Sequence, residues 1–210
     1  MIAVVLLYVG AVLLINGIWI LGTALAEAPA REMARAEAGA ERPSPRGGVP
    51  TGRNYLSIGS REIFVINLFA GGLGFLIAMF SIVRVNPATT GAAEIEFGGL
   101  VLLFAFTYLW VAINQITGAD GRGLGWYCLF VAITAVPTAI IVLLTSRGHA
   151  WPLWLGLDWA AWAVLWFLFF LLLALQRPIG RLVGIVTIVE AIVTCWIPAY
   201  LLLTGYLPGT

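Results

Sequence analysis

Six long apolar runs constrain this chain more than any other feature of its sequence. Each has the roughly 20 residues that a helix needs to cross the hydrocarbon core of a bilayer. A segment inside lipid must satisfy its own backbone hydrogen bonds, so each run is predicted to be a helix. The predicted spans are residues 2–24, 62–83, 97–116, 125–144, 159–175 and 182–203. The predicted fold class is therefore all-α, a polytopic membrane protein with six transmembrane helices.

The composition supports the same interpretation. Of the 210 residues, 61% are hydrophobic and 10% are charged, whereas soluble domains carry about 25% charged residues. One helical bundle uses the whole length, so residues 1–210 are predicted to form a single membrane domain. The formal net charge is +1, and without a basic stripe nucleic acid is not expected as a partner.

Residue types that support enzyme chemistry are scarce. All eleven basic residues are arginines, which excludes a lysine Schiff base and a phosphate-loop lysine. The single histidine, His149, cannot build a histidine metal cluster. Cys128 and Cys195 lie in apolar runs and are interpreted as small buried hydrophobes. We therefore expect no enzyme activity, no cofactor and no metal.

The distribution of arginine predicts the orientation in the membrane. Nine arginines follow spans 1, 3 and 5, and only Arg84 and Arg147 lie on the other side. The positive-inside rule then places both termini outward, in a bacterial inner (plasma) membrane. Residues 25–60 would form a long cytoplasmic loop. Its front half is predicted to include a short solvated helix, and residues 42–50, rich in proline and glycine, are predicted to be flexible.

An acidic residue interrupts the last apolar run. Glu190 lies eight residues into that run, about 12 Å from its start. A charge at this depth costs about 2.5 kcal/mol or more, so it needs a partner, a proton or a water-filled space. Such residues usually mark a functional pathway. The structural alternative is a protonated glutamate that hydrogen-bonds a neighbouring helix.

Aromatic residues recur at helical spacing in two other runs. Trp159, Trp162 and Trp166 are spaced i, i+3 and i+7, so they share one helix face, and Phe104 and Tyr108 share another. An unpaired indole N–H in lipid is costly, so a row of tryptophans in a span suggests a use for these donors. Ordinary interhelical packing is the alternative for both sets. A narrow passage lined by polar and aromatic groups fits them best.

Weak internal similarity suggests a repeat of two-helix hairpins, three in all. The similar segments 6–16 of span 1 and 102–114 of span 3 both close with an asparagine, Asn16 and Asn114, and spans 4 and 6 each carry a proline, Pro137 and Pro198. The two amides are interpreted either as interhelical hydrogen-bond donors or as pathway groups. Three small residues in the second span would allow close helix approach: Gly71, Gly72 and Gly74.

Five motifs together resemble the AmiS/UreI family of urea and short-chain amide channels. They are LLYVG at 6–10 with Asn16 and Gly17; FAFTYL at 104–109 with AIN at 112–114; WYCLFVAI at 126–133 with VP at 136–137; AVLW at 163–166; and Glu190 with WIPA at 196–199. The resemblance implies six helices and one pore per protomer, a hexameric ring around a lipid-filled centre, and passive flux of urea or amides to a cytoplasmic urease or amidase.

The resemblance also implies pathway residues. Glu190 matches the pore carboxylate of the family, and the other matching positions are Trp159, Trp162, Leu165 and Trp166 in span 5, Phe104 and Tyr108 in span 3, and Val9, Leu13 and Asn16 in span 1.

Two departures from the family are visible. Its acid-gated urea channels carry several histidines in their outward loops, which titrate near neutral pH. Here those loops are predicted to hold only His149 with Glu94, Glu96 and Asp158. We therefore predict a channel with weak pH gating or none. The second departure is the long first cytoplasmic loop, which family members with short loops lack.

Two other functions fit the same residues. A proton-coupled urea or amide transporter would use Glu190 as its proton site. A membrane scaffold or sensor would signal through the long first loop. Urea and acetamide remain equal candidates for the main solute.

Overall fold

The protein is described by a computed structural model that covers residues 1–39, 56–85 and 91–207, with side chains for all of these except 29–39. Within this part of the chain six helices are long and apolar enough to cross a membrane, which confirms the all-α, multi-pass prediction. The elements are α1 (Ile2–Gly39), α2 (Ser60–Val83), α3 (Gly91–Thr117), α4 (Arg122–Thr145), α5 (Ala150–Leu173), and a last span made of α6 (Gly180–Glu190), a π-helical turn η1 (Ala191–Trp196) and α7 (Ile197–Leu203).

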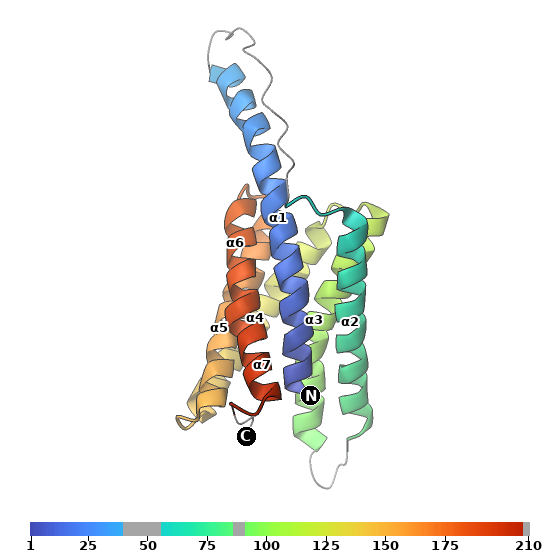
Figure 1. Cartoon of the computed structure of the whole chain (residues 1–210), viewed down its shortest axis with the longest axis vertical. Helices are drawn as coiled ribbons and strands as arrows, with labels where there is room; N and C mark the ends of the chain where they lie inside the picture. Colours follow the sequence, from blue (N-terminus) through green and yellow to red (C-terminus); the bar gives the residue numbers. More distant parts are fainter. Residues whose placement is uncertain (40–55, 86–90, 208–210) are drawn as a thin grey trace.

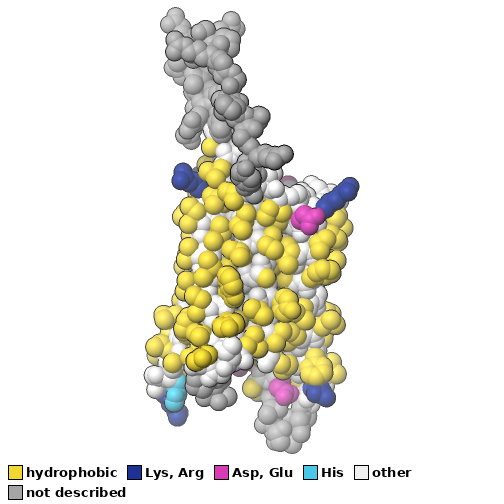
Figure 2. Space-filling model, in the orientation of Figure 1, with side chains coloured by type: hydrophobic (Ala, Val, Ile, Leu, Met, Phe, Trp, Pro, Cys, Tyr) yellow, Lys and Arg dark blue, Asp and Glu magenta, His cyan; other side chains and the backbone are white. Residues whose placement is uncertain are grey.

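The helices form one upright bundle with both termini at the same end (Figure 1). Hydrophobic side chains cover the flank of the visible face, and charged side chains gather at its two ends (Figure 2). Large apolar residues are exposed along the spans, for example Phe69, Ile133 and Leu144. An apolar exposed belt between two charged rims is the surface expected of a protein that spans a bilayer.

The spans pack in three pairs. α2 packs along α3 and α4 packs along α5, whereas α1 packs against α6, η1 and α7, so the two ends of the chain close the third pair (Figure 1). Helices that follow each other in the chain therefore pair only from α2 onward, because α1 pairs with the last span. An internal repeat in the sequence itself stays a prediction.

Glycines allow α1 and α6 to approach closely. A Cβ added at Gly184 would lie 2.8 Å from the backbone nitrogen of Leu21, and one added at Gly17 would lie 2.7 Å from Cγ1 of Ile188. Real Cβ atoms do not approach other atoms so closely, and the small residues let the two backbones meet as in other membrane helix pairs.

The glycines of α2 have different roles. A Cβ at Gly71 would lie 2.8 Å from Cγ of Leu109, so this position requires a small residue against α3. A Cβ at Gly72 would meet nothing within 4 Å. The packing role predicted for Gly72 is therefore wrong, because this residue faces away from the neighbouring helix.

A reciprocal amide pair links α1 to α2. Asn16 donates from Nδ2 to Oδ1 of Asn67 at 3.0 Å, and Asn67 donates back to Oδ1 of Asn16 at 2.7 Å. Asn67 also donates to the carbonyl of Ile63 at 2.8 Å, and both amides are buried. The interhelical interpretation of Asn16 is thus observed, with Asn67 as a partner that the sequence did not indicate.

Two helix boundaries differ from the predicted ones by nine residues or more. α1 continues without a break to Gly39, so the predicted solvated helix is an extension of the first span beyond the bundle (Figure 1). α5 begins at Ala150, nine residues before the predicted start. The stretch 42–50, predicted to be flexible, lies outside the described residues.

Candidate functional site

A cavity of about 550 Å³ enters the bundle from the end where α1, α3 and α5 finish. Its mouth includes polar side chains such as Asn114, Gln115 and Arg177. Towards the middle of the bundle its lining becomes aromatic and apolar, with contributions from Leu13 on α1 and Leu165 on α5. The volume is large enough for several water molecules or a small organic solute.

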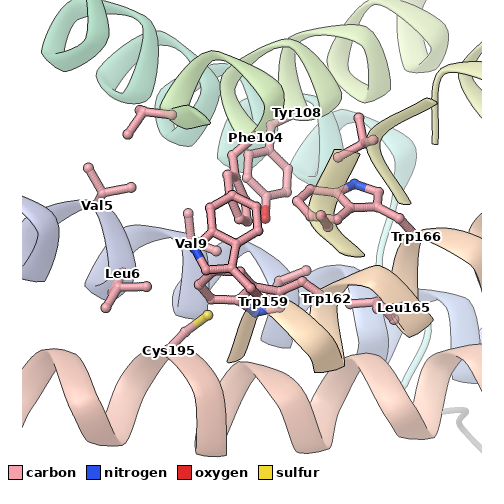
Figure 3. Packing of buried hydrophobic residues seen from close by; sticks show 14 of the residues in the cluster. Val5, Leu6, Val9, Phe104, Tyr108, Trp159, Trp162, Leu165, Trp166 and Cys195 are labelled. Atoms are coloured by element: carbon pink, nitrogen blue, oxygen red, sulfur yellow. The ribbon is translucent and has the colours of Figure 1, made fainter. Parts of the chain in front are cut away.

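Five aromatic side chains close the inner end of the cavity, and we call them the ring layer: Phe104, Tyr108, Trp159, Trp162 and Trp166. All are at most 8% exposed, and α3 and α5 supply them. Figure 3 shows the rings meeting one another, with Val9 and Cys195 beside them.

Phe104 is the centre of the ring layer. Its ring centroid lies 5.7 Å from that of Trp159, 5.0 Å from that of Trp162 and 4.7 Å from that of Trp166. Trp159 and Trp162 meet edge to face with centroids 5.2 Å apart. These are the separations at which aromatic pairs attract. The predicted row of tryptophans thus shares one face of α5 and packs around a single phenylalanine of α3.

A hydrogen bond fixes the orientation of Trp162. Its Nε1 donates to Oγ1 of Thr194 at 2.9 Å, and the same hydroxyl donates to the backbone carbonyl of Glu190 at 2.7 Å. Trp162 and Thr194 are both buried. The indole donor is therefore already occupied by protein. Thr194 was missed from sequence because a threonine in an apolar run gives no signal until its partner on another helix is known.

The last span is irregular where it meets the ring layer. The N–H of Ile197 bonds the carbonyl of Ile192, five residues back, and the π-helical turn η1 directly follows Glu190. Pro198 comes next and has no N–H to donate, so the regular α pattern is lost at this point. Single π-turns within helices often lie at functional sites.

Glu190 lies within the bundle at the edge of η1 and is 7% exposed. Its Oε2 has no hydrogen-bond partner among the described residues. A hydrogen bond from Oε2 to a neighbouring helix, which the structural alternative needs, is therefore not observed in this part of the chain.

Asp158 corrects the sequence prediction. It was placed in an outward loop, but it lies inside α5, is 2% exposed, and directly precedes Trp159. The error follows from the predicted start of this helix. α5 begins at Ala150 and not at residue 159, so Asp158 lies within the helix. Glu190 is therefore not the only acidic side chain buried in a span.

The cavity brings together seven of the ten predicted pathway residues: Leu13, Asn16, Phe104, Tyr108, Trp162, Leu165 and Trp166. Val9 instead lines a void of about 10 Å³ that it shares with Phe104 and Tyr108. Trp159 and Glu190 line neither space. Asp158 likewise lines neither of these two spaces.

These features define a class of protein: a polytopic α-helical membrane protein with a cavity that ends at an aromatic constriction inside the bundle of a single chain. Comparison with known proteins narrows the class. Residues 53–206 match the family model described as AmiS/UreI family transporter, and the chain belongs to this family.

Relatives include both amide and urea proteins. The chain is 37% identical over 202 residues to a protein of Mycolicibacterium smegmatis named for the transport of amidate substrates, a match that covers 95% of this chain and 75% of the relative. It is 37% identical over 163 residues to an acid-activated urea channel of Helicobacter pylori, covering 66% and 82%. The crystal structure of the urea channel from H. pylori has a TM-score of 0.72 at 31% identity, with 98% and 99% of the two chains covered.

Proposed function

We propose that the protein is a passive channel for small neutral planar solutes, namely urea and short-chain aliphatic amides, with one pathway through each protomer. The observation that carries this proposal is the cavity that ends on the ring layer inside a single bundle. The named functions of the relatives, urea channel and amidate transporter, support the same class of solute.

The ring layer suits a flat, uncharged solute. A planar molecule can pass between rings that part slightly, and its faces exchange water for aromatic surface. An ion would have to lose its hydration shell, and the rings provide no substitute for it. Because Thr194 occupies the N–H of Trp162, the solute carbonyl is left with the Tyr108 hydroxyl and the other indoles as donors. The solute N–H groups would then meet Glu190.

The same proposal includes the orientation of the protein in its membrane and its partners. Nine of eleven arginines on one side favour both termini outward in the inner membrane. The cavity then opens to the cytoplasm, where a urease or amidase would consume the solute. Family membership supports a homohexamer around a lipid-filled centre. The proposal also includes a single membrane domain over residues 1–210 and a cytoplasmic location for the long loop at 25–60.

Stopped-flow swelling of proteoliposomes tests the function. Urea, acetamide and formamide should enter faster than they enter empty liposomes, whereas glycerol, which is not planar, should not. Leu165→Trp adds bulk to a residue that is 5% exposed at the cavity end and should abolish this flux. Val164→Trp, on the same helix but 56% exposed on the outer surface, is the matched control and should conduct normally. Equal urea flux in loaded and empty liposomes would refute the proposal.

A proton-coupled transporter is the second candidate, and the buried Glu190 with an unpaired oxygen is the observation that favours it. A carrier would accumulate urea or amide against its gradient when a proton gradient is imposed. We expect only downhill flux that is unchanged when an uncoupler dissipates the proton gradient. Uphill uptake that stops with the uncoupler would favour the carrier.

A further inference from the structure

Asp158 is a buried carboxyl that has no evident structural partner for one of its oxygens. It lies eight residues into α5, about 12 Å along the helix axis, and is 2% exposed. Its Oδ2 has no partner among the described residues. A buried acceptor without a donor costs free energy, so an unfilled one inside a span calls for a ligand.

A second unpaired carboxyl oxygen lies near it on another helix. Oε2 of Glu190 is also buried and unpaired, and the backbone of Glu190 is linked to α5 through Thr194, whose hydroxyl accepts from Nε1 of Trp162 and donates to the Glu190 carbonyl. Oδ2 of Asp158 and Oε2 of Glu190 do not hydrogen-bond each other, since each is without a partner among the described residues. The two helices therefore present two separate acceptors to the same region.

Asp158 lies next to the ring layer but does not line the cavity. Asp158 is the residue before Trp159, whose ring packs on Phe104 and Trp162. Trp162 and Phe104 line the cavity, but Trp159, Asp158 and Glu190 do not. Asp158 precedes these tryptophans along α5, whose last residues lie at the cavity mouth, so it lies farther from the mouth than they do.

We propose that Asp158 is a second solute-binding residue of the pathway, and that it and Glu190 together accept hydrogen bonds from the N–H groups of a solute at the ring layer. This inference rests on the proposed function. A primary amide or urea has an NH₂ group with two donors, which suits two acceptors from different helices. A carboxyl keeps an acceptor oxygen in either protonation state, so this role holds for both forms. The pair would select solutes by their number of N–H groups as well as by shape.

The test compares acetamide, N-methylacetamide and N,N-dimethylacetamide, which carry two, one and no N–H groups, in proteoliposome flux. Asp158→Leu removes both acceptors, and Asp158→Asn keeps size and one acceptor. We expect Asp158→Leu to lower acetamide flux about tenfold, as the loss of a good buried hydrogen bond would, while N,N-dimethylacetamide changes little. Asp158→Asn should give an intermediate preference for acetamide. Glu96→Gln, which changes an exposed carboxyl of α3, should leave the ratios as in the wild type.

A change in the ratio separates solute binding from a structural role. If both Asp158 variants slow all three amides by the same factor, or leave every rate unchanged, Asp158 does not read N–H groups and the inference is overturned. Should Asp158→Leu fail to fold, the acetamide ratio of Asp158→Asn decides alone. If the wild type conducts urea and acetamide, the proposed function stands whatever the Asp158 variants do. If the wild type conducts neither, the proposed function itself fails.

Discussion

The hydrogen bond between Trp162 and Thr194 should be an energetic link between α5 and the last span. Nε1 of Trp162 lies 2.9 Å from the hydroxyl oxygen, and the two residues are 3% and 4% exposed. Thr194→Val keeps the shape of the side chain but removes the acceptor, which leaves the indole N–H buried without a partner. The expected cost is about 1–3 kcal/mol in the free energy of unfolding.

A double-mutant cycle isolates the contribution of this hydrogen bond. Trp162→Phe removes the donor and part of the ring, so its own cost includes lost packing. In the double variant no donor is left unpaired, and the combined cost should be smaller than the sum. The expected coupling energy is about 0.6–1.7 kcal/mol, the range for interhelical hydrogen bonds in membranes. The measurement is equilibrium unfolding in mixed micelles with increasing denaturing detergent.

A matched cycle provides the control. Trp166→Phe makes the same chemical change one turn further along the same face of α5. The ring centroid of Trp166 lies 4.7 Å from that of Phe104. Because the observed bond of Thr194 is to Trp162, Thr194→Val and Trp166→Phe should be additive within about 0.5 kcal/mol. Additive costs in the Trp162 cycle, or equal coupling in both cycles, would refute the claim that this hydrogen bond holds the ring layer to η1.

Four other predictions follow from the packing and the charges. Phe104→Ala removes the ring at the centre of three indoles; it should cost about 3–5 kcal/mol and raise glycerol permeability in stopped-flow swelling. Gly184→Ala should cost about 1–3 kcal/mol, while Gly72→Ala, with open space around its Cβ, should be neutral in thermal unfolding. Asn67→Leu leaves an amide of α1 unpaired and should cost about 1–3 kcal/mol in detergent unfolding. Urea flux should change less than severalfold between pH 7 and pH 5, because His149 is the only histidine.

Each of these has a distinct contrary result. Unchanged glycerol exclusion in Phe104→Ala would mean that another element forms the barrier. Equal stability of the two glycine variants would contradict the close approach of α1 and α6. A further loss when the partner amide is also replaced by leucine would contradict the reciprocal pair, since removing both amides should recover stability. A severalfold rise of urea flux at pH 5 would show acid gating and overturn the last prediction.

The hydropathy of the sequence predicts the number of spans because each run alone is long enough to cross a bilayer. It places the start of α5 wrongly, since Trp151, Pro152 and Trp154 are residue types typical of a membrane interface. In the structure Trp151 is buried and the helix already runs from Ala150. The same error placed Asp158 in a loop.

The ring layer is only partly predictable. Helical spacing shows that the tryptophans of α5 share a face, and it shows the same for Phe104 and Tyr108. Spacing within one helix cannot show that Phe104 meets three indoles at once. Thr194 and Asn67 are likewise defined by partners 32 and 51 residues away in sequence. Contacts of this kind depend on how the helices pair, which no single span specifies.

The most direct test of the central claim is block of urea flux by a thiol reagent at Leu165, the residue that lies at the cavity end beside the ring layer. Leu165→Cys would be labelled with a small methanethiosulfonate in a background where Cys128 and Cys195 are alanine, with Tyr206→Cys, 81% exposed, as the control. We predict that labelled Leu165→Cys proteoliposomes lose urea flux to the level of empty liposomes, that reductant restores it, and that labelled Tyr206→Cys conducts normally. Undiminished urea flux through fully labelled Leu165→Cys protein would contradict a pathway through the ring layer.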